Sequence, residues 1–286
     1  MAEWSEGSSN ATWIEFYNSA ATRAWADHHE PIDRLFAGLT KSALDIAAPQ
    51  PGERALDIGC GSGTTVLELA ARVGPDGYIL GADISQRSVA KASERIAAAG
   101  LRHAEVALTD VSAHPFEPAS FDLVFSRFGV MFFSDPIAAF SNVRQAMKPG
   151  GRLALIVFRT AAENPWTVRP LAAVRHLLPP PSGVDEPAMF AWADPARVTR
   201  ILEDAGFYRV SLMPLDPTMT LGGPGGAADA AELAMMIGTL PQAMLRISAS
   251  QRQAVQSTLE AFFQGHDGPQ GIGLPGAQWV VQARLD

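Results

Sequence analysis

Three glycines separated by single residues follow an acidic residue in an early apolar run. The acid is Asp57, and the glycines are Gly59, Gly61 and Gly63. Glycine at alternate positions lets the backbone take positive φ angles and approach a ligand where a Cβ atom would collide. Apolar residues at helical spacing begin at Val66, so the segment predicts a strand that turns tightly into a helix around a ligand.

The spacing of this loop disfavours a ligand that carries phosphate. Dinucleotide-binding loops have the pattern G-x-G-x-x-G and hold a pyrophosphate at the helix N-terminus. Here the third glycine comes one residue early, and Thr64 stands where that pattern has glycine. The carboxylate of Asp57 suits a cationic ligand, and S-adenosylmethionine carries an ammonium and a sulfonium but no phosphate. Taken alone, the loop is also compatible with a tight turn that binds nothing.

Two further acids are predicted at the ends of the next two strands. Tyr78 to Asp83 is a short apolar run, and a carboxylate at its end can accept hydrogen bonds from both hydroxyls of a ribose. Asp83 can instead cap the helix predicted from Ser85 to Gly100, although Ser85 can supply that cap itself. The strand His103 to Leu108 leads to Asp110, which can accept from an adenine amino group.

Strand and helix alternate through this half of the chain. A strand over Phe121 to Ser126 precedes a helix that Asp135 and Pro136 begin, and Arg152 to Phe158 is a nearly continuous apolar strand. Such alternation requires a parallel sheet with helices on both faces, which binds its ligand across the carboxyl ends of the strands. The fold class is therefore α/β and doubly wound.

Five segments in this order resemble the class I S-adenosylmethionine-dependent methyltransferases. Within that class they are similar to the small-molecule branch that includes the ubiquinone and menaquinone C-methyltransferases. The segments are Leu56 to Gly63, Gly81 to Ser85, Thr109 to Phe116, Phe121 to Val124, and Met147 to Leu153. The resemblance covers about residues 50 to 160, and it implies a Rossmann-like sheet of seven strands. It places the last strand, Ala277 to Arg284, antiparallel between the fifth and the sixth.

The resemblance also implies which residues hold the cofactor, S-adenosyl-L-methionine. Those expected beside its methionine part are Asp57, Gly59, Gly61, Gly63 and, through its backbone, Ser126. Asp83 is expected to hold the ribose, Asp110 and Val111 the adenine, and Ile84 belongs to the same cofactor-binding set. No spacing of His, Asp or Glu indicates a metal site.

The expected organisation is one core with additions. An N-terminal helical lid is expected over residues 1–48 and the cofactor-binding core over residues 49–160. A substrate-cap insertion over residues 161–194 follows, and residues 195–286 complete the sheet around a helical insertion at about 221–276. The lid helices are predicted over Ala11 to Asp27 and Ile32 to Ala47. Tyr17 or Trp25 of the lid can contact the cofactor, or can dock the helix on the sheet.

The acceptor is expected at the end of the fourth strand. Arg127 is the candidate catalytic residue, because it can orient an anionic or carbonyl-bearing acceptor; it can also pair with an acid of the lid. Phe128, Met131 and Trp166 are candidate substrate contacts that form an apolar wall. Methyl transfer is an in-line displacement, so alignment and exclusion of water supply most of the catalysis. Histidine bases are available, but none belongs to a recognisable catalytic arrangement.

Composition limits the partners. The net charge of −8 without a basic stripe argues against nucleic acid as a partner. Cys60 is the single cysteine, which excludes an internal disulfide. No apolar run reaches the ~18 residues of a membrane span, and the N-terminus lacks the pattern of a signal peptide, so a cytoplasmic protein is expected. Peripheral membrane contact stays compatible with a lipid-like acceptor, and oligomerisation is open.

The sequence thus predicts an S-adenosylmethionine-dependent methyltransferase that acts on a small molecule. An aromatic or quinone-like acceptor is favoured, and transfer to carbon, oxygen or nitrogen is unresolved. A non-catalytic S-adenosylmethionine-binding protein and a methyltransferase of macromolecules are the alternatives. An NAD-dependent oxidoreductase is a further rival, which the loop spacing disfavours.

Overall fold

A single sheet organises the chain in the computed structural model, which describes residues 10–180, 189–238, 240–267 and 271–286. In these residues the sheet has seven strands in the order β3-β2-β1-β4-β5-β9-β6. The first five strands along the chain pair in parallel, whereas β9 runs antiparallel to both β5 and β6. The predicted fold class and the place of the antiparallel last strand are confirmed.

The parallel strands are short except for the last. They are β1 (Arg54–Ile58), β2 (Tyr78–Asp83), β3 (Ala104–Leu108), β4 (Phe121–Arg127) and β5 (Met147–Phe158). The strand β5 begins five residues earlier than the predicted start at Arg152, because Met147 pairs with Phe121 before a register shift in the β4–β5 ladder. Residues 147–151 are therefore part of the sheet as well.

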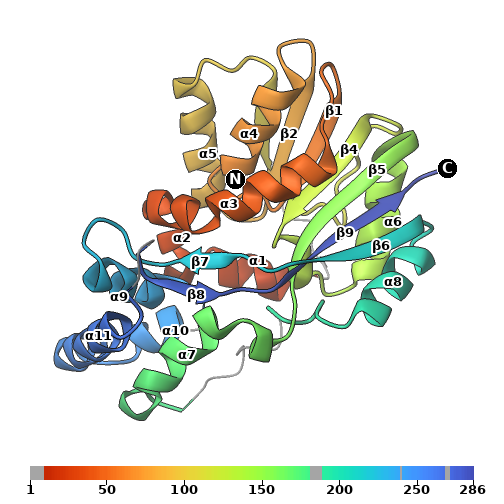
Figure 1. The fold of residues 1–286 in the computed structure, drawn as a ribbon. Helices are drawn as coiled ribbons and strands as arrows, with labels where there is room; N and C mark the ends of the chain where they lie inside the picture. Colours follow the sequence, from red (N-terminus) through yellow and green to blue (C-terminus); the bar gives the residue numbers. More distant parts are fainter. Residues whose placement is uncertain (1–9, 181–188, 239, 268–270) are drawn as a thin grey trace.

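Helices cover both faces of this sheet (Figure 1). The helices α3 (His29–Ala47), α4 (Thr64–Val73) and α5 (Gln86–Ala98) lie on one face, and α6 (Pro136–Ala146) and α8 (Pro195–Asp204) lie on the other. The side chains of Ser85, Asp135 and Asp194 accept backbone N–H bonds at the starts of α5, α6 and α8. These N-caps define the residue at which each of the three helices begins.

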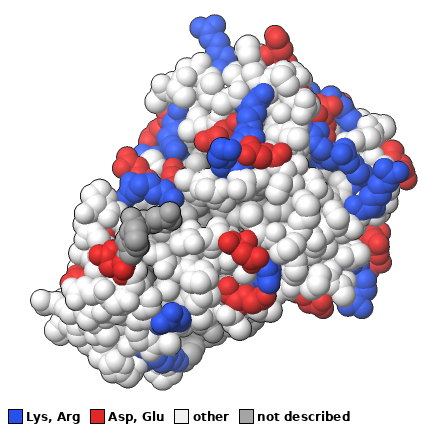
Figure 2. Space-filling model, viewed as in Figure 1, with Lys and Arg blue, Asp and Glu red and all other residues white. Residues whose placement is uncertain are grey.

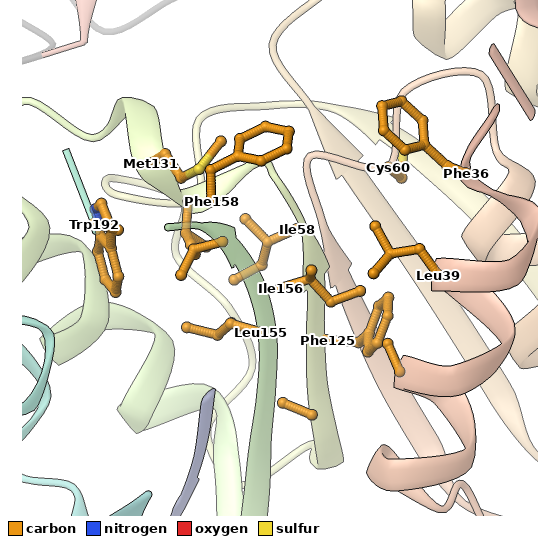
Figure 3. Close-up of a cluster of buried hydrophobic side chains, with 14 of the residues drawn as sticks. Phe36, Leu39, Ile58, Cys60, Phe125, Met131, Leu155, Ile156, Phe158 and Trp192 are labelled. Atoms are coloured by element: carbon orange, nitrogen blue, oxygen red, sulfur yellow. The ribbon is translucent and has the colours of Figure 1, made fainter. Parts of the chain in front are cut away.

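The two faces of β5 contribute to one continuous apolar core. Figure 3 shows Leu155 and Ile156 on opposite sides of their strand, as the twofold alternation of a strand requires. On one side Leu39 of α3 packs near Phe125, and on the other side Trp192 approaches the sheet. The helix α3 of the lid is thereby anchored by the same core that holds the sheet together.

The first lid helix was predicted as one piece over 11–27, and this prediction is wrong. It consists of α1 (Ala11–Tyr17), a 3-10 turn η1 (Ala20–Thr22) and α2 (Ala24–Asp27). Ser19 is extended and its hydroxyl accepts from the backbone N–H of Ala21, so the helix cannot continue. The side chain of Asn18 donates to the carbonyl of Ile84 and accepts from the N–H of Gln86. These bonds tie the break to the end of β2.

The second half of the chain adds helices and a small sheet below the lid in Figure 1. The helices are α7 (Pro165–Val174), α9 (Ala227–Met236), α10 (Leu240–Leu245) and α11 (Ala249–Gln264), and the strands are β6 (Tyr208–Leu215) and β9 (Gln278–Arg284). A two-stranded antiparallel sheet of β7 (Thr218–Thr220) and β8 (Gly273–Pro275) encloses the helical insertion, and the sequence did not predict it. Residues 181–188 of the expected substrate-cap insertion lie outside the described residues.

Asn164 joins the first insertion to the last strand. It is fully buried; its Nδ2 donates to the carbonyls of Ala277 (2.9 Å) and Thr160 (3.0 Å). Its Oδ1 accepts from the N–H of Ala277 (2.9 Å) and from Nε1 of Trp166 (3.2 Å). One amide therefore satisfies several polar groups that have no access to water.

We expect Asn164→Ala to lower the free energy of unfolding by about 2–4 kcal/mol, because it leaves buried backbone and indole groups unpaired. Denaturant unfolding followed by fluorescence measures this loss. Gln253→Ala, at an exposed amide of α11, serves as the control and should change the stability little. Equal stability of Asn164→Ala and the wild-type protein would contradict the role of the network.

Candidate active site

A cavity lies at the carboxyl ends of the parallel strands, between the sheet, the lid and the insertions. It contains about 1360 Å³ of space, including the part that opens to solvent. The predicted site residues that line it are Gly59, Gly61, Asp83, Ile84, Asp110, Val111, Arg127, Phe128, Met131 and Trp166. Asp57, Gly63 and Ser126 lie behind this lining.

Glycine occupies the three loop positions for different physical reasons. All have positive φ, but a Cβ on Gly59 would lie 2.6 Å from Cα of Gly129, and one on Gly63 would lie 2.9 Å from Cβ of Ala92. These two positions need glycine because protein atoms approach closely. A Cβ on Gly61 would meet no atom within 4 Å. Gly61 is therefore the glycine of this loop whose bare backbone borders open space in the cavity.

Asp83 holds the glycine loop against the end of β2. Its Oδ2 accepts from the N–H of Gly61 and its Oδ1 from the N–H of Ser85, both at 2.8 Å. Burial raises the pKa of Asp83, although these N–H bonds oppose the change. Ser85 caps α5, as was predicted, so Asp83 is not needed as a cap. Each carboxylate oxygen has a second lone pair for a ligand.

Asp110 is held by the first described residue of the lid. Its Oδ1 accepts from Nδ2 of Asn10 (2.9 Å) and from the hydroxyl of Ser112 (2.8 Å). The oxygen of the Asn10 amide accepts from the N–H of Ser134 (2.9 Å), so this buried side chain links two loops of the cavity. Sequence reasoning missed Asn10, because its partners lie about a hundred or more residues away along the chain.

Asp57 is fully buried beneath the glycine loop. Its Oδ2 accepts from the hydroxyl of Thr65, whereas its Oδ1 has no hydrogen-bond partner. Burial raises the pKa of Asp57 to about 7, and the Thr65 bond and the charge of Arg127 only partly oppose it. The carboxyl is thus divided between its neutral and its charged form near neutral pH.

Ser126 ties the ends of β1 and β4 together. Its hydroxyl donates to the carbonyl of Ile58 (2.7 Å) and accepts from the N–H of Gly129 (3.2 Å). Between them, Phe128 has a φ of 67°, which is unfavourable for a residue with a side chain. This conformation is held by the bond from its N–H to the carbonyl of Ile156 (3.0 Å).

An aromatic wall also lines the cavity. The ring of Phe128 stacks on Phe158 with centroids 4.1 Å apart and planes at 6°. Phe36 packs against Phe128 (5.2 Å) and against the edge of Trp166 (6.0 Å). Figure 3 shows Met131 beside Phe158. The sequence prediction included Phe128, Met131 and Trp166 but not Phe36 or Phe158, which were hidden in ordinary apolar periodicity.

Arg127 places a positive charge beside the aromatic wall. Its Nη1 donates to the hydroxyl of Thr40 (2.6 Å), and its guanidinium lies over the ring of Phe36 at 5.2 Å. Among the described residues no carboxylate lies within 4.0 Å of it, so the lid contact predicted for Arg127 is to a hydroxyl and not to an acid. Burial lowers the pKa of Arg127, while the charges of Asp33 and Asp57 oppose this.

Asp33 of α3 clamps the lid to the glycine loop. It accepts from the hydroxyl of Thr64 and from Nη2 of Arg95 (2.9 Å), and Nδ1 of His29 lies 3.4 Å from its Oδ2. Arg95 also donates to the carbonyl of Ser62 (2.8 Å). Sequence reasoning missed this cluster, although His29 and Asp33 have the i,i+4 spacing of neighbours on a helix.

In the part of the chain that the structure describes, no group of three or more His, Cys, Asp or Glu residues could hold a metal ion. No helix there is long and apolar enough to cross a membrane.

A family model described as a methyltransferase domain matches residues 49–206, which is more than half of the chain. This chain belongs to the methyltransferase domain family. Aklanonic acid methyltransferase DauC of Streptomyces sp. (strain C5) is 33% identical over 149 residues, which cover 50% of this chain and 68% of the relative. Nocamycin O-methyltransferase of Saccharothrix syringae is 30% identical over 186 residues, or 62% and 66% of the two chains. Demethylmenaquinone methyltransferase of Bacillus cytotoxicus is 27% identical and is covered to 78%.

Solved structures share the fold at low sequence identity. Phosphoethanolamine N-methyltransferase 2 of Haemonchus contortus in complex with S-adenosyl-L-methionine has a TM-score of 0.58 and 17% identity, covering 97% of this chain and 60% of that one. The [4+2]-cyclase SpnF has a TM-score of 0.53 and 20% identity, covering 87% and 80%. These likenesses concern the fold alone.

The methyltransferase uses S-adenosylmethionine as its cofactor, as the sequence predicted. The residues that line the cavity fit S-adenosylmethionine in two respects. Gly61 leaves its backbone face open, and the acids Asp83 and Asp110 border the same cavity. The orphaned oxygen of Asp57 behind the loop adds negative potential, which favours a cation over a phosphate.

We expect the stability of the wild-type methyltransferase to carry a pH-dependent contribution from Asp57. Its folded pKa of about 7 lies above its ordinary value of 3.8, so the folded state holds a proton that the unfolded state has lost between these values. This contribution therefore falls as pH rises through that window and is constant above it. Asp57→Asn removes it. The stability of the variant relative to wild type should rise by roughly 2–3 kcal/mol from about pH 5 to about pH 8.

Urea unfolding of both proteins across this pH range measures the difference between their free energies of unfolding. The contributions of other titrating groups are the same in both proteins and cancel in this difference. Asp76→Asn, at an exposed loop acid, controls for the loss of one charge. A pH-independent difference between Asp57→Asn and wild type would contradict the raised pKa.

Proposed function

We propose that this methyltransferase transfers the methyl group of S-adenosylmethionine to a small planar aromatic or quinone-like molecule. The observation that carries the proposal is that two sets of residues line one cavity. One set is polar and includes Gly61 and Asp83, and the other is the aromatic wall with Arg127. The names of relatives that act on aklanonic acid, nocamycin and demethylmenaquinone support a small-molecule acceptor.

The polar set is proposed as the cofactor subsite. Asp83 would accept from the ribose hydroxyls, and Asp110 with Val111 would hold the adenine. The remaining proposed cofactor residues are Asp57, Gly59, Gly61, Gly63, Ile84 and Ser126. The support differs among them: Gly61 borders open space, whereas Asp57, Gly63 and Ser126 would act by shaping the loop from behind. When bound, the cofactor supplies a methyl carbon activated by its sulfonium.

The aromatic wall is proposed as the acceptor subsite. Phe128, Met131 and Trp166 would pack on a planar ring system and exclude water from it. Among the residues that the structure describes, Arg127 has no carboxylate partner within 4.0 Å, so a carbonyl or anionic oxygen of the acceptor would satisfy its buried charge. This arrangement supports catalysis by alignment and desolvation, which methyl transfer mainly requires.

The additions to the core are proposed to close this subsite. The lid (residues 1–48) contributes Trp13, Tyr17 and Trp25 to the cavity lining, and the insertions over 161–194 and about 221–276 contribute Trp166, Met189 and Ile237. Aromatic and apolar walls on all these sides favour a small acceptor over a macromolecule.

Surface charge also favours a small acceptor over nucleic acid. Figure 2 shows Lys and Arg interspersed with Asp and Glu on the face drawn, without a continuous basic stripe. Nucleic-acid binding draws most of its affinity from such a positive surface. We propose a cytoplasmic enzyme, since an acidic chain with one free cysteine suits a reducing compartment.

The transfer itself is tested with S-adenosylmethionine labelled in its methyl group. We expect label to enter hydroxylated naphthoquinones or anthraquinones, and not matched arylamines, DNA or casein. Calorimetry first establishes binding of S-adenosylmethionine. Binding without transfer to any member of the panel would favour the non-catalytic alternative.

Asp83→Ala should weaken S-adenosylmethionine binding by on the order of 2 to 3 kcal/mol, because two charge-assisted ribose bonds are lost. Asp83→Asn keeps one acceptor oxygen and should lie between the Ala variant and wild type. Ser85→Ala, which removes only the cap of α5, is the control for loosening of this segment. An unchanged dissociation constant for Asp83→Ala in calorimetry would show that the ribose assignment is wrong.

Arg127→Gln should raise the KM for an acceptor with a carboxylate by roughly 10- to 100-fold, because a charge-assisted bond is lost. The neutral amide keeps a donor for Thr40, and the dissociation constant of S-adenosylmethionine should not change. Steady-state kinetics with an anthraquinone and its carboxylated analogue separate these effects. Arg87→Gln, an exposed arginine paired with Asp27, is the control. A change confined to cofactor binding would instead assign Arg127 to the cofactor.

A further inference from the structure

The first two turns of α3 present one stripe of side chains to the cavity. His29, Ile32, Asp33 and Phe36 all line it. Their spacing is that of a single helix face. Phe36 belongs to the aromatic wall, and His29 lies seven residues earlier, about 10 Å away along the helix axis. The stripe therefore joins the proposed acceptor subsite to a titratable side chain.

The carboxylate beside this histidine is fixed in place. Asp33 accepts from Thr64 of the glycine loop and from Arg95 of α5, so its position is determined by three elements. Nδ1 of His29 lies 3.4 Å from Oδ2 of Asp33. This is longer than an ordinary hydrogen bond. Bonds of catalytic histidines are often long without substrate and tighten when it binds.

The partner of Nδ1 decides what the other ring nitrogen can do. A neutral imidazole that donates from Nδ1 to a carboxylate carries its lone pair on Nε2. No described residue makes a hydrogen bond with Nε2 of His29, and the side chain is 20% exposed at the cavity. Nε2 is thus a base that a ligand in the cavity can reach.

We infer that His29 is the general base of this methyltransferase, which removes the proton of a phenol or enol hydroxyl as that oxygen is methylated, and that Asp33 positions it. The inference rests on the proposed function and narrows its acceptor to a hydroxyl compound. His29 is the catalytic residue, since its Nε2 touches the acceptor. Asp33 is a positioning residue that acts through His29.

The step balances with the cofactor alone. The hydroxyl oxygen forms a bond to the methyl carbon as the bond from that carbon to sulfur breaks. The bonding pair stays on sulfur, and the sulfonium becomes a neutral thioether. Nε2 takes the hydroxyl proton, so the positive charge passes from sulfonium to imidazolium. Without a base, the product would be a protonated ether at oxygen.

Other groups at the cavity are less suited to this role. Asp83 and Asp110 are engaged by backbone or side-chain N–H donors. Burial raises the pKa of Tyr17 far above neutrality, so its hydroxyl keeps its proton. Among the described residues His29 is the histidine that lines the cavity.

The charged groups around the histidine come from several elements. Asp33 lies on the same helix, and Arg95 reaches it from α5. Asp83 of β2, Asp110 after β3 and Arg127 of β4 line the same cavity. Glu30 and Arg34 are its exposed neighbours on α3.

The tautomer is tested first, without any acceptor. We expect ¹⁵N NMR of the full-length protein to show the neutral imidazole of His29 protonated at Nδ1 and bare at Nε2. Asp33→Asn should remove this preference. A His29 that is protonated at Nε2 in the wild-type protein overturns the inference.

The chemical role is tested with 2-hydroxyanthraquinone, a planar phenol whose absorption changes when it ionises. His29→Gln should lower kcat about 100-fold or more, the usual contribution of a general base. It should also abolish the limb of the pH profile that belongs to the base, and leave the dissociation constant of S-adenosylhomocysteine within about twofold. With S-adenosylhomocysteine present, the bound probe should ionise at lower pH in wild type than in His29→Gln. His28→Gln, at the exposed neighbour outside the cavity lining, is the matched control.

Asp33→Asn distinguishes positioning from catalysis. We expect an intermediate loss of kcat and a shifted, not absent, limb at low pH, where the general base becomes protonated. Weaker S-adenosylhomocysteine binding by His29→Gln at unchanged kcat overturns the inference and makes His29 a cofactor ligand. Failure of wild type to bind or methylate the phenol, while it binds S-adenosylmethionine and methylates a carbon or nitrogen acceptor, also overturns it. Failure to bind S-adenosylmethionine at all overturns the proposed function itself.

Discussion

The close approach of the loops after β1 and β4 is the constraint on which the cavity depends. Gly59 and Gly129 meet so closely that neither has room for a Cβ atom, and the hydroxyl of Ser126 bridges the two strand ends. Parallel neighbours bring their carboxyl ends to one edge of the sheet, but only this contact makes a continuous floor there. It also requires the backbone to turn sharply at Phe128, whose positive φ delivers its ring to Phe158.

The lid is held to this floor by polar contacts at each strand end and not by apolar packing alone. Asn10 reaches Asp110, Asn18 reaches the end of β2, and Asp33 reaches the glycine loop. These bonds are directional, so they set the lid in one register over the cavity. Water is kept from the proposed acceptor subsite because the same segments carry the aromatic side chains. Positioning and desolvation thereby have a common structural origin.

The charged groups in the cavity floor lie in a region of low dielectric constant, where each charge strongly affects the others. Burial drives Asp57 toward its neutral form, and Arg127 lies near it, with no carboxylate of the described residues in direct contact with the guanidinium. A cationic cofactor and an anionic or carbonyl oxygen would each relieve one of these costs. The electrostatics of the floor thus fit a positively charged donor and an oxygen-bearing acceptor together.

Three features depend on local spacing in the chain: the glycine loop, the acids at successive strand ends, and the alternation of strand and helix. The sequence alone was therefore enough to predict the α/β fold and the cofactor S-adenosylmethionine. The strand β2 was predicted to the residue, because its apolar run ends at a clear turn signal. The β7–β8 sheet, the break at Asn18 and the roles of Asn10, Asp33 and Phe158 were not predictable in this way. Each depends on a partner far away in the chain. The periodicity of a sequence does not indicate which distant residue will be in contact after folding. Spacing along the chain decided which cofactor the protein uses, and the packing of distant segments decided the shape and chemistry of the space beside it.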